Sequence, residues 1–147
     1  MMEDAEKTSI FVEKMADFFR YNVKKGEEDA TLEEELEAVD NYIYILNVRF
    51  AGDIHFSKKV ECDVENVRVP SMILQPVVEN AVNHGIRNID WEGHIDLSVE
   101  RWNDHIEISV RDNGLGYRTG EQIQRVLVQK KSNSSYRRGD SNGNRNE

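Results

Sequence analysis

The chain has 147 residues, of which 38% are hydrophobic and 32% charged, a balance that suits one globular domain with a small appendage. Acidic residues outnumber basic ones by 28 to 19, and the net charge of −9 argues against a general nucleic-acid binder, which needs a basic face. Cys62 is the only cysteine, so an internal disulfide is excluded and a reducing compartment fits. No apolar run approaches roughly 18 residues, and the acidic N-terminus lacks the pattern of a signal peptide.

Two helices are predicted in the first third of the chain. The first runs over residues 3–25 and ends at Gly26; its apolar seam is Val12, Met15, Ala16, Phe19 and Val23, flanked by Phe11 and Phe18. The second begins at Thr31, because Thr31 and Glu34 have the spacing of a capping box. The short connection predicts that the two helices lie antiparallel.

The second helix carries a heptad-like seam that allows two interpretations. Its apolar residues step by 4, 3, 4, 3 and 4 through Leu32, Leu36, Val39, Ile43, Leu46 and Phe50. Because this 3.5-residue period is typical of coiled coils, we expect a helical hairpin that dimerises into a bundle. The alternative is a hairpin packed on its own globular domain.

Alternating apolar residues predict strands in the middle of the chain. The first strand follows a break at Gly52 and Asp53; apart from Lys58, one face carries Ile54, Phe56, Val60, Cys62 and Val64. We interpret Cys62 as a small core residue, because no basic neighbour favours a reactive thiolate. Two further strands form an antiparallel hairpin around a turn at residues 102–104, with Ile95, Leu97 and Val99 on one and Ile106, Ile108 and Val110 on the other.

The segment 74–86 is predicted to be a helix with two distinct faces. Leu74, Val77, Val78, Ala81 and Val82 share the core-facing side. Asn80, Asn83 and His84 share another sector, with the Asn80 amide expected to be half-buried. Gly85 can end the helix, and Pro76 either kinks its first turns or delays its start. The polar sector is either one wall of a ligand site or a solvated surface.

The strand that ends at Asp112 carries a carboxylate on its apolar side. Asp112 has the same parity as Ile106, Ile108 and Val110, so its side chain should point inward, which is costly unless it accepts hydrogen bonds. Gly114 and Gly116 follow and permit the backbone to approach a ligand closely. Alternatively, Asp112 only caps its own turn, as Asp-Asn-Gly sequences readily do.

A third helix is predicted from Thr119 to about Lys131, because Gln122 completes a second capping-box pattern and Ile123, Val126 and Leu127 make a thin apolar stripe. Residues 132–147 contain one sizeable apolar group, Tyr136, and we expect this tail to be disordered.

Three motifs in this order resemble the LytS-like (YesM-like) branch of bacterial sensor histidine kinases, whose ATP-binding domain belongs to the class shared with gyrase and heat-shock ATPases. They are the capped helix starting at Thr31, the segment 74–85, and Asp112-Asn113-Gly114-Leu115-Gly116. The resemblance covers about residues 11–131. It implies an α+β fold, a two-layer α/β sandwich with a mostly antiparallel sheet, preceded by a helical hairpin. The implied division is a hairpin over 1–51, an incomplete ATP-binding domain over 52–131, and the tail over 132–147.

The resemblance also implies roles for individual residues, with ATP and Mg²⁺ as cofactors. The Asn80 oxygen would ligate Mg²⁺, and Asn83 and His84 would face the phosphates. The Asp112 carboxylate would accept from the exocyclic amine of adenine. Two glycines, Gly114 and Gly116, would let the next loop pass over the nucleotide. Glu79 is a candidate for orienting a metal-bound water, with an ordinary helix residue as the alternative.

Three departures from the family pattern bear on activity. The family often carries a lysine where Asn83 stands, so a positive charge toward the phosphates would be missing. None of the four histidines, His55, His84, His94 and His105, has the context of the phosphoacceptor. Residues 139–143 resemble the approach to a second glycine box, but the box itself does not follow. We therefore expect this chain alone not to autophosphorylate.

These observations predict the ATP-binding catalytic part of a two-component sensor histidine kinase, which transfers phosphoryl from ATP to a histidine absent from this chain. The expected partners are a response regulator and a second copy bound through the hairpin, with no nucleic acid. The chain is expected to be soluble and cytoplasmic, and its parent membrane-anchored. The alternative is a non-enzymatic dimerising fragment with a dead nucleotide site. A P-loop ATPase is excluded by the lack of Gly-Lys-Ser/Thr, and a zinc hydrolase by the scattered histidines.

Overall fold

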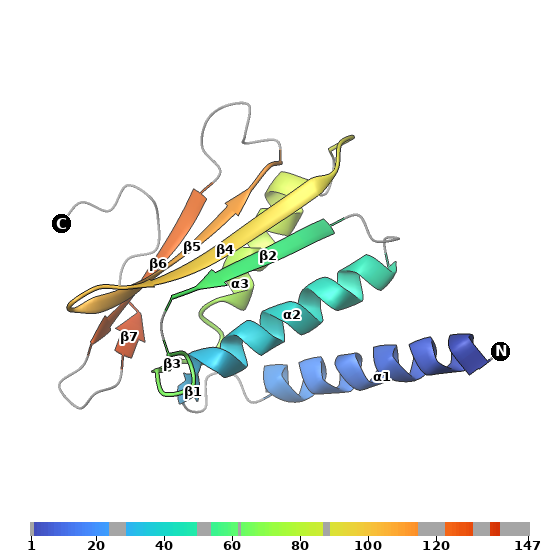
Figure 1. Ribbon diagram of the computed structural model, residues 1–147, viewed down its shortest axis with the longest axis horizontal. Coiled ribbons are helices and arrows are strands. Elements are labelled where there is room, and N and C mark those ends of the chain that lie inside the picture. Colours follow the sequence, from blue (N-terminus) through green and yellow to red (C-terminus); the bar gives the residue numbers. More distant parts are fainter. Residues whose placement is uncertain are drawn as a thin grey trace.

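The structure is a computed structural model that describes residues 2–23, 29–49, 54–61, 63–86, 89–114, 123–130 and 136–138. Two long helices lie near the N-terminus, α1 (Met2–Val23) and α2 (Leu32–Arg49). They run antiparallel, as predicted, and α1 packs on the side of α2 that faces away from the sheet (Figure 1). The predicted capping box is present: the Thr31 N–H donates to Glu34 Oε1 at 2.9 Å, and the Glu34 N–H donates to Thr31 Oγ1 at 3.1 Å.

A five-stranded sheet forms the second layer, in the order β2-β4-β5-β6-β7. Its strands are β2 (Ile54–Val60), β4 (Gly93–Arg101), β5 (His105–Asp112), β6 (Ile123–Lys130) and β7 (Tyr136–Arg138). A small antiparallel pair is separate from it, β1 (Asp29–Thr31) with β3 (Arg68–Pro70). The pairing of β2 with β4 is parallel and the other pairings in the large sheet are antiparallel. The expected two-layer α+β fold with a mostly antiparallel sheet is confirmed.

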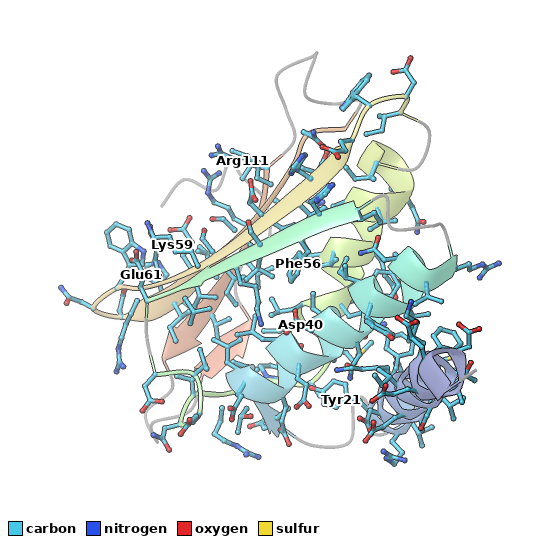
Figure 2. All side chains as sticks on the ribbon, turned by 45° about the vertical axis from the view of Figure 1, so that its right-hand side comes forward. Tyr21, Asp40, Phe56, Lys59, Glu61 and Arg111 are labelled. Carbon is cyan, nitrogen blue, oxygen red and sulfur yellow. The ribbon has the colours of Figure 1, made fainter. Side chains whose placement is uncertain are left out.

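The core lies between one face of this sheet and the helices that cover it (Figure 1). The predicted hairpin is confirmed, since β4 and β5 pair Leu97 with Val110 and Val99 with Ile108. The inward residues of the three central strands are buried: Ile95, Leu97, Val99, Ile106, Ile108, Val110, Val126 and Val128. Strand β2 contributes Ile54, and Phe56 lies on the side facing the helices (Figure 2). The predicted strand extends to Val64, but β2 ends at Val60. Cys62 lies outside the described residues.

The heptad-like seam of α2 packs on its own domain. Leu32, Leu36, Val39 and Ile43 are buried in the core, and Leu46 packs against it. Phe50 lies outside the described residues, as do the predicted breaks at Gly26, Gly52 and Asp53. The second interpretation of this seam therefore holds for α2, because the helix needs its apolar stripe to cover the sheet. Residues on both sides of the expected boundary near residue 51 contribute to this core, and the division into domains stays a prediction.

The predicted seam of α1 is wrong for three of its five members. Val12, Phe19 and Val23 are 59%, 57% and 76% exposed. The face that contacts α2 is instead rotated toward the flanking aromatic residues, so that the Phe18 ring stacks on Tyr42 with centroids 6.0 Å apart. Tyr21 lies between α1 and α2 (Figure 2). A moderately amphipathic helix can turn either flank toward a neighbour, and aromatic packing on α2 decides the choice.

The predicted third helix is also wrong, because residues 123–130 form strand β6. Its buried residues alternate, with Val126 opposite Ile108 and Val128 opposite Ile106. A local helical spacing loses here because β5 would otherwise expose an unpaired edge, and a Val-Leu-Val run suits a strand. Thr119 and Gln122, the expected cap, lie outside the described residues.

The described part of the C-terminal tail, residues 136–138, forms β7 against β6. The remainder of 132–147, including the glycine-rich 139–143, lies outside the described residues, and its disorder stays a prediction. Among the described helices, none combines the length and the apolar content that a membrane crossing needs.

Candidate nucleotide site

The helix predicted over residues 74–86 begins at Gln75 and has two parts, α3 (Gln75–Ala81) and η1 (Val82–Ile86), the second in π-helical geometry. Pro76 lies in the first turn, where its missing N–H costs no helical hydrogen bond, so it delays the start of the helix rather than kinking it. The predicted core face is confirmed by the burial of Leu74, Val77, Val78, Ala81 and Val82. π-Helical turns are frequent at functional sites.

The polar sector of this helix faces outward. Asn80, Asn83 and His84 are all exposed, which corrects the expectation of a half-buried Asn80 amide. The buried residues Val78, Ala81 and Val82 define the core-facing sector of the helix, and Asn80 falls outside that sector. An exposed amide row is accessible to a ligand, and it is equally compatible with a solvated surface.

Asp112 points inward at the end of β5, as its parity predicts. It is 6% exposed, and in the register with β4 it lies opposite Ile95. Its Oδ1 accepts the Gly114 N–H at 2.8 Å. The turn-capping alternative is thus also present, because the same carboxylate holds the backbone of the glycine turn.

Two glycines allow η1 to touch this carboxylate. A Cβ placed on Gly85 would lie 2.5 Å from Asp112 Oδ1, and one on Gly114 would lie 1.8 Å from the Gly85 carbonyl oxygen. Neither position has room for a side chain. Asn80 on α3 precedes Gly85 on η1 by five residues. The exposed amide row and the glycine that contacts the inward acid therefore lie on one continuous helical segment.

Burial makes the Asp112 carboxyl group a weaker acid than an ordinary aspartate. Desolvation raises the pKa of its carboxyl group above the ordinary value, and the hydrogen bond from the Gly114 N–H opposes this shift. A further hydrogen-bond donor would stabilise the ionised form of this buried carboxyl group, because the donor would replace water that was lost on burial.

Asn113, which the sequence motif did not single out for a role, clamps the loop before β4. Its Oδ1 accepts the His94 N–H at 2.7 Å, its Nδ2 donates to the Glu92 carbonyl at 2.9 Å, and its own carbonyl accepts Trp91 Nε1 at 2.7 Å. The only advance signal was the tendency of Asp-Asn-Gly to form a turn. Asn113 thus fixes the strand end from which Asp112 projects.

Glu35 is the second residue that sequence reasoning missed. It is 2% exposed, and its carboxylate accepts the N–H groups of Met72, Ile73 and Leu74 at 2.7, 2.9 and 3.1 Å. The Tyr21 hydroxyl also donates to it, and burial followed by this hydrogen bond raises the pKa of Tyr21. Glu35 therefore holds the turn that leads into α3, where Met72 has a left-handed φ of 63°. A Glu in an acidic run reads as solvated, and nothing local marks it as buried.

Glu79 has a structural partner, since its carboxylate accepts Gln75 Nε2 at 2.9 Å. Its role toward a metal-bound water stays a prediction. Gly116 lies outside the described residues.

Comparison with known proteins links this geometry to one family. A family model described as "Histidine kinase" matches residues 1–54. The sensor histidine kinase BtsS of Escherichia coli K12 is 32% identical over 110 residues, which cover 75% of this chain and 20% of that protein. The sensor protein LytS of Staphylococcus epidermidis is 30% identical over 114 residues, 77% of this chain and 19% of that protein.

The chain belongs to the LytS-like sensor histidine kinases. It spans about a fifth of the length of these curated relatives. A solved catalytic domain of histidine kinase ThkA also aligns, with 20% identity and a TM-score of 0.44, covering 58% of this chain and 57% of that one. At that distance the sequence matches, and not the structural alignment, carry the assignment to histidine kinases.

Proposed function

We propose that this chain is the ATP-binding catalytic part of a two-component sensor histidine kinase, in which ATP lies between Asp112 and the polar sector of α3 and η1. The observation that carries the proposal is the close approach of Gly85 to the buried Asp112 carboxylate, which joins the two expected ligand-binding motifs at one place. Membership of the histidine kinases supports the same reaction class.

The chain's own residues would bind and orient the nucleotide. Asp112 would accept the exocyclic amine of adenine, which replaces water lost on burial and rejects guanine, whose oxo group at that position is itself an acceptor. The Gly114 N–H holds the carboxylate in place. Asn83 and His84, both exposed, would donate to phosphate oxygens, and Gly116 would permit the following loop to pass over the ligand.

The exposed amide oxygen of Asn80 fits Mg²⁺, because that ion takes a neutral oxygen ligand when phosphates and water complete its octahedron. Bound there, Mg²⁺ would neutralise phosphate charge during phosphoryl transfer. Glu79 lies one residue before Asn80 and would be in reach of a water on that ion. The acceptor would be a histidine absent from this chain, because none of its four histidines, His55, His84, His94 and His105, has the sequence context of the phosphoacceptor.

We assign two partners to the same proposal. A response regulator would accept the phosphoryl group. The reaction would take place in the cytoplasm, and the full-length protein that contains this chain would be anchored in a membrane. A second copy would dock on the outer face of α1. The seam of α2 is buried in the core, and the exposed large apolar residues of the described part of the hairpin are Ile10, Val12, Phe19 and Val23 on α1 and Val48 on α2. An open hollow of about 620 Å³ beside them, between α1 and α2, is lined in part by Phe19 and Val23.

Calorimetric titration with a non-hydrolysable ATP analogue and excess Mg²⁺ tests the nucleotide site. We expect saturable binding that weakens at least about tenfold in Asp112→Asn, because a hydrogen bond to a charged group is worth ~1.5–3 kcal/mol. Asp104→Asn is the matched control, since Asp104 is exposed at the opposite end of the β4–β5 hairpin and should leave affinity unchanged. Absence of heat at millimolar nucleotide would support the non-enzymatic dimerising fragment instead.

A further inference from the structure

Two histidines and a glutamate converge at the end of the sheet where β2 and β4 begin. The parallel register of β2 and β4 places His55 directly beside His94. Their rings stack with centroids 4.8 Å apart and 17° between the ring planes. Glu92 immediately precedes β4; its Oε2 lies 3.1 Å from His55 Nε2, and its Oε1 lies 3.7 Å from His94 Nε2.

The three side chains can offer one ligand atom each, and these atoms lie within 4.8 Å of one another. A tetrahedral ion with bonds of ~2.0–2.1 Å needs neighbouring ligand atoms about 3.4 Å apart, so small side-chain rotations complete the geometry. The side chains of His55, Glu92 and His94 are 50%, 70% and 48% exposed, which leaves them free to rotate and leaves a fourth position open to water.

The backbone beneath this cluster is held from both sides. Asn113 bonds the His94 N–H and the Glu92 carbonyl, as described above. On β2, the Ile54 N–H donates to Asn47 Oδ1 and Asn47 Nδ2 donates to the Ile54 carbonyl, each at 2.9 Å. Fixed backbones on both strands reduce the entropy that an ion must overcome to order its ligands.

We propose that His55, Glu92 and His94 form a binding site for a divalent transition-metal ion of the Zn²⁺ class. Two imidazoles with one carboxylate are a donor set that Zn²⁺ accepts and that Mg²⁺, which prefers oxygen, does not. The ion would join the edge strand β2 to β4 and so stabilise that side of the sheet. The site is distinct from the proposed nucleotide site in residues and in metal preference.

Calorimetric titration of the whole chain with Zn²⁺ in excess Mg²⁺ tests the site, in a Cys62→Ser background that removes the chain's only thiol. We expect one ion per chain. His55→Ala and His94→Ala should each weaken binding at least about tenfold, because even residues that only support a ligand cost that much. His105→Ala is the matched control and should leave affinity unchanged, since His105 lies at the other end of β4 and β5 and pairs with Asp104.

A second readout keeps the result clear of folding effects. Zn²⁺ should raise the melting temperature of the parent and of His105→Ala but not of the His55→Ala, His94→Ala double variant, whose circular dichroism should match the parent. The proposal is overturned if Zn²⁺ does not bind saturably at millimolar concentration, or if the double variant binds as the parent does. The first result would leave only the ring stacking and the histidine–glutamate contacts at this place.

Discussion

At the scale of single residues, Asp112 is both buried and a cap of its own turn, while its role toward a nucleotide stays a proposal. Its carboxylate caps the Gly114 N–H and lies buried against Gly85. Burial of an ionised carboxylate with one backbone donor is unfavourable for the folded state alone, as the raised pKa of Asp112 records. A residue that costs stability in the free protein and lies beside a polar helix face is typical of a ligand site.

This cost predicts a pH-dependent stability difference for Asp112→Asn. Asp112 is protonated in both the folded and the unfolded state below its ordinary pKa of about 3.9, so no cost of burying a charge arises there. Because the folded-state pKa is raised, the folded state loses stability as pH rises through that raised pKa. The asparagine variant avoids this loss. Its free energy of unfolding in urea, compared with the parent, should therefore increase between about pH 4 and about pH 7.

Asp104→Asn provides the control of opposite sign. The hydrogen bond with His105 lowers the pKa of the exposed Asp104 carboxyl group. The free energy of unfolding of Asp104→Asn, compared with the parent, should therefore not increase between about pH 4 and about pH 7. A stability difference for Asp112→Asn that does not change with pH would mean that the Asp112 carboxylate remains hydrated in solution.

At the scale of elements, a buried glutamate joins three helices through one turn. Glu35 on α2 accepts three N–H groups of the turn before α3 and the hydroxyl of Tyr21 on α1. The start of α3 is thereby fixed relative to the hairpin, although Leu74 at its N-cap makes no side-chain cap of its own.

Glu35→Gln should destabilise the chain by about 2–3 kcal/mol, measured by urea unfolding, because the amide NH₂ replaces an acceptor that faces two donors. Tyr21→Phe should cost only ~1 kcal/mol, since Met72 still donates to the same oxygen. Glu34→Gln is the matched control one residue away, because glutamine also closes a capping box. Equal losses for Glu35→Gln and Glu34→Gln would contradict a special role for Glu35.

At the scale of the whole molecule, the outer helix leaves apolar side chains in water. α1 covers α2 with part of its surface, while Val12 and Phe19 on the same helix are more than half exposed. A 22-residue helix is about 33 Å long, enough for one side of an interface of standard size. This geometry favours a dimer through α1 rather than through the seam first expected on α2.

Replacing Val12 and Phe19 by Glu should weaken dimerisation at least about tenfold, because a truncated hot-spot residue typically costs 2 kcal/mol or more. Sedimentation velocity over a range of chain concentrations measures the effect. Trp102→Glu is the control, an exposed apolar residue at the turn between β4 and β5. If the parent chain is monomeric at every concentration, the α1 face is not an interface between copies.

Much of the local structure could be predicted from the sequence, because short-range periodicity and capping are properties of neighbouring residues. The capping box at Thr31, the β4–β5 hairpin, the core face of α3 and the inward side of Asp112 all follow from spacings within a few residues. The family could be recognised from three short sequence motifs, because such motifs can be read without knowing how the strands pair.

Only the tertiary structure decided which elements meet. Helical spacing at Ile123 and Val126 gave way to β6 because the edge of β5 needed a partner, and pairing with a neighbouring strand outweighs the local helical pattern. The burial of Glu35 depends on a turn almost forty residues later, and the pairing of His55 with His94 depends on a parallel register. Whether such a contact forms depends on the free-energy cost of desolvating the polar groups and on the hydrogen bonds that they gain from distant residues. A local sequence pattern contains no information on that difference.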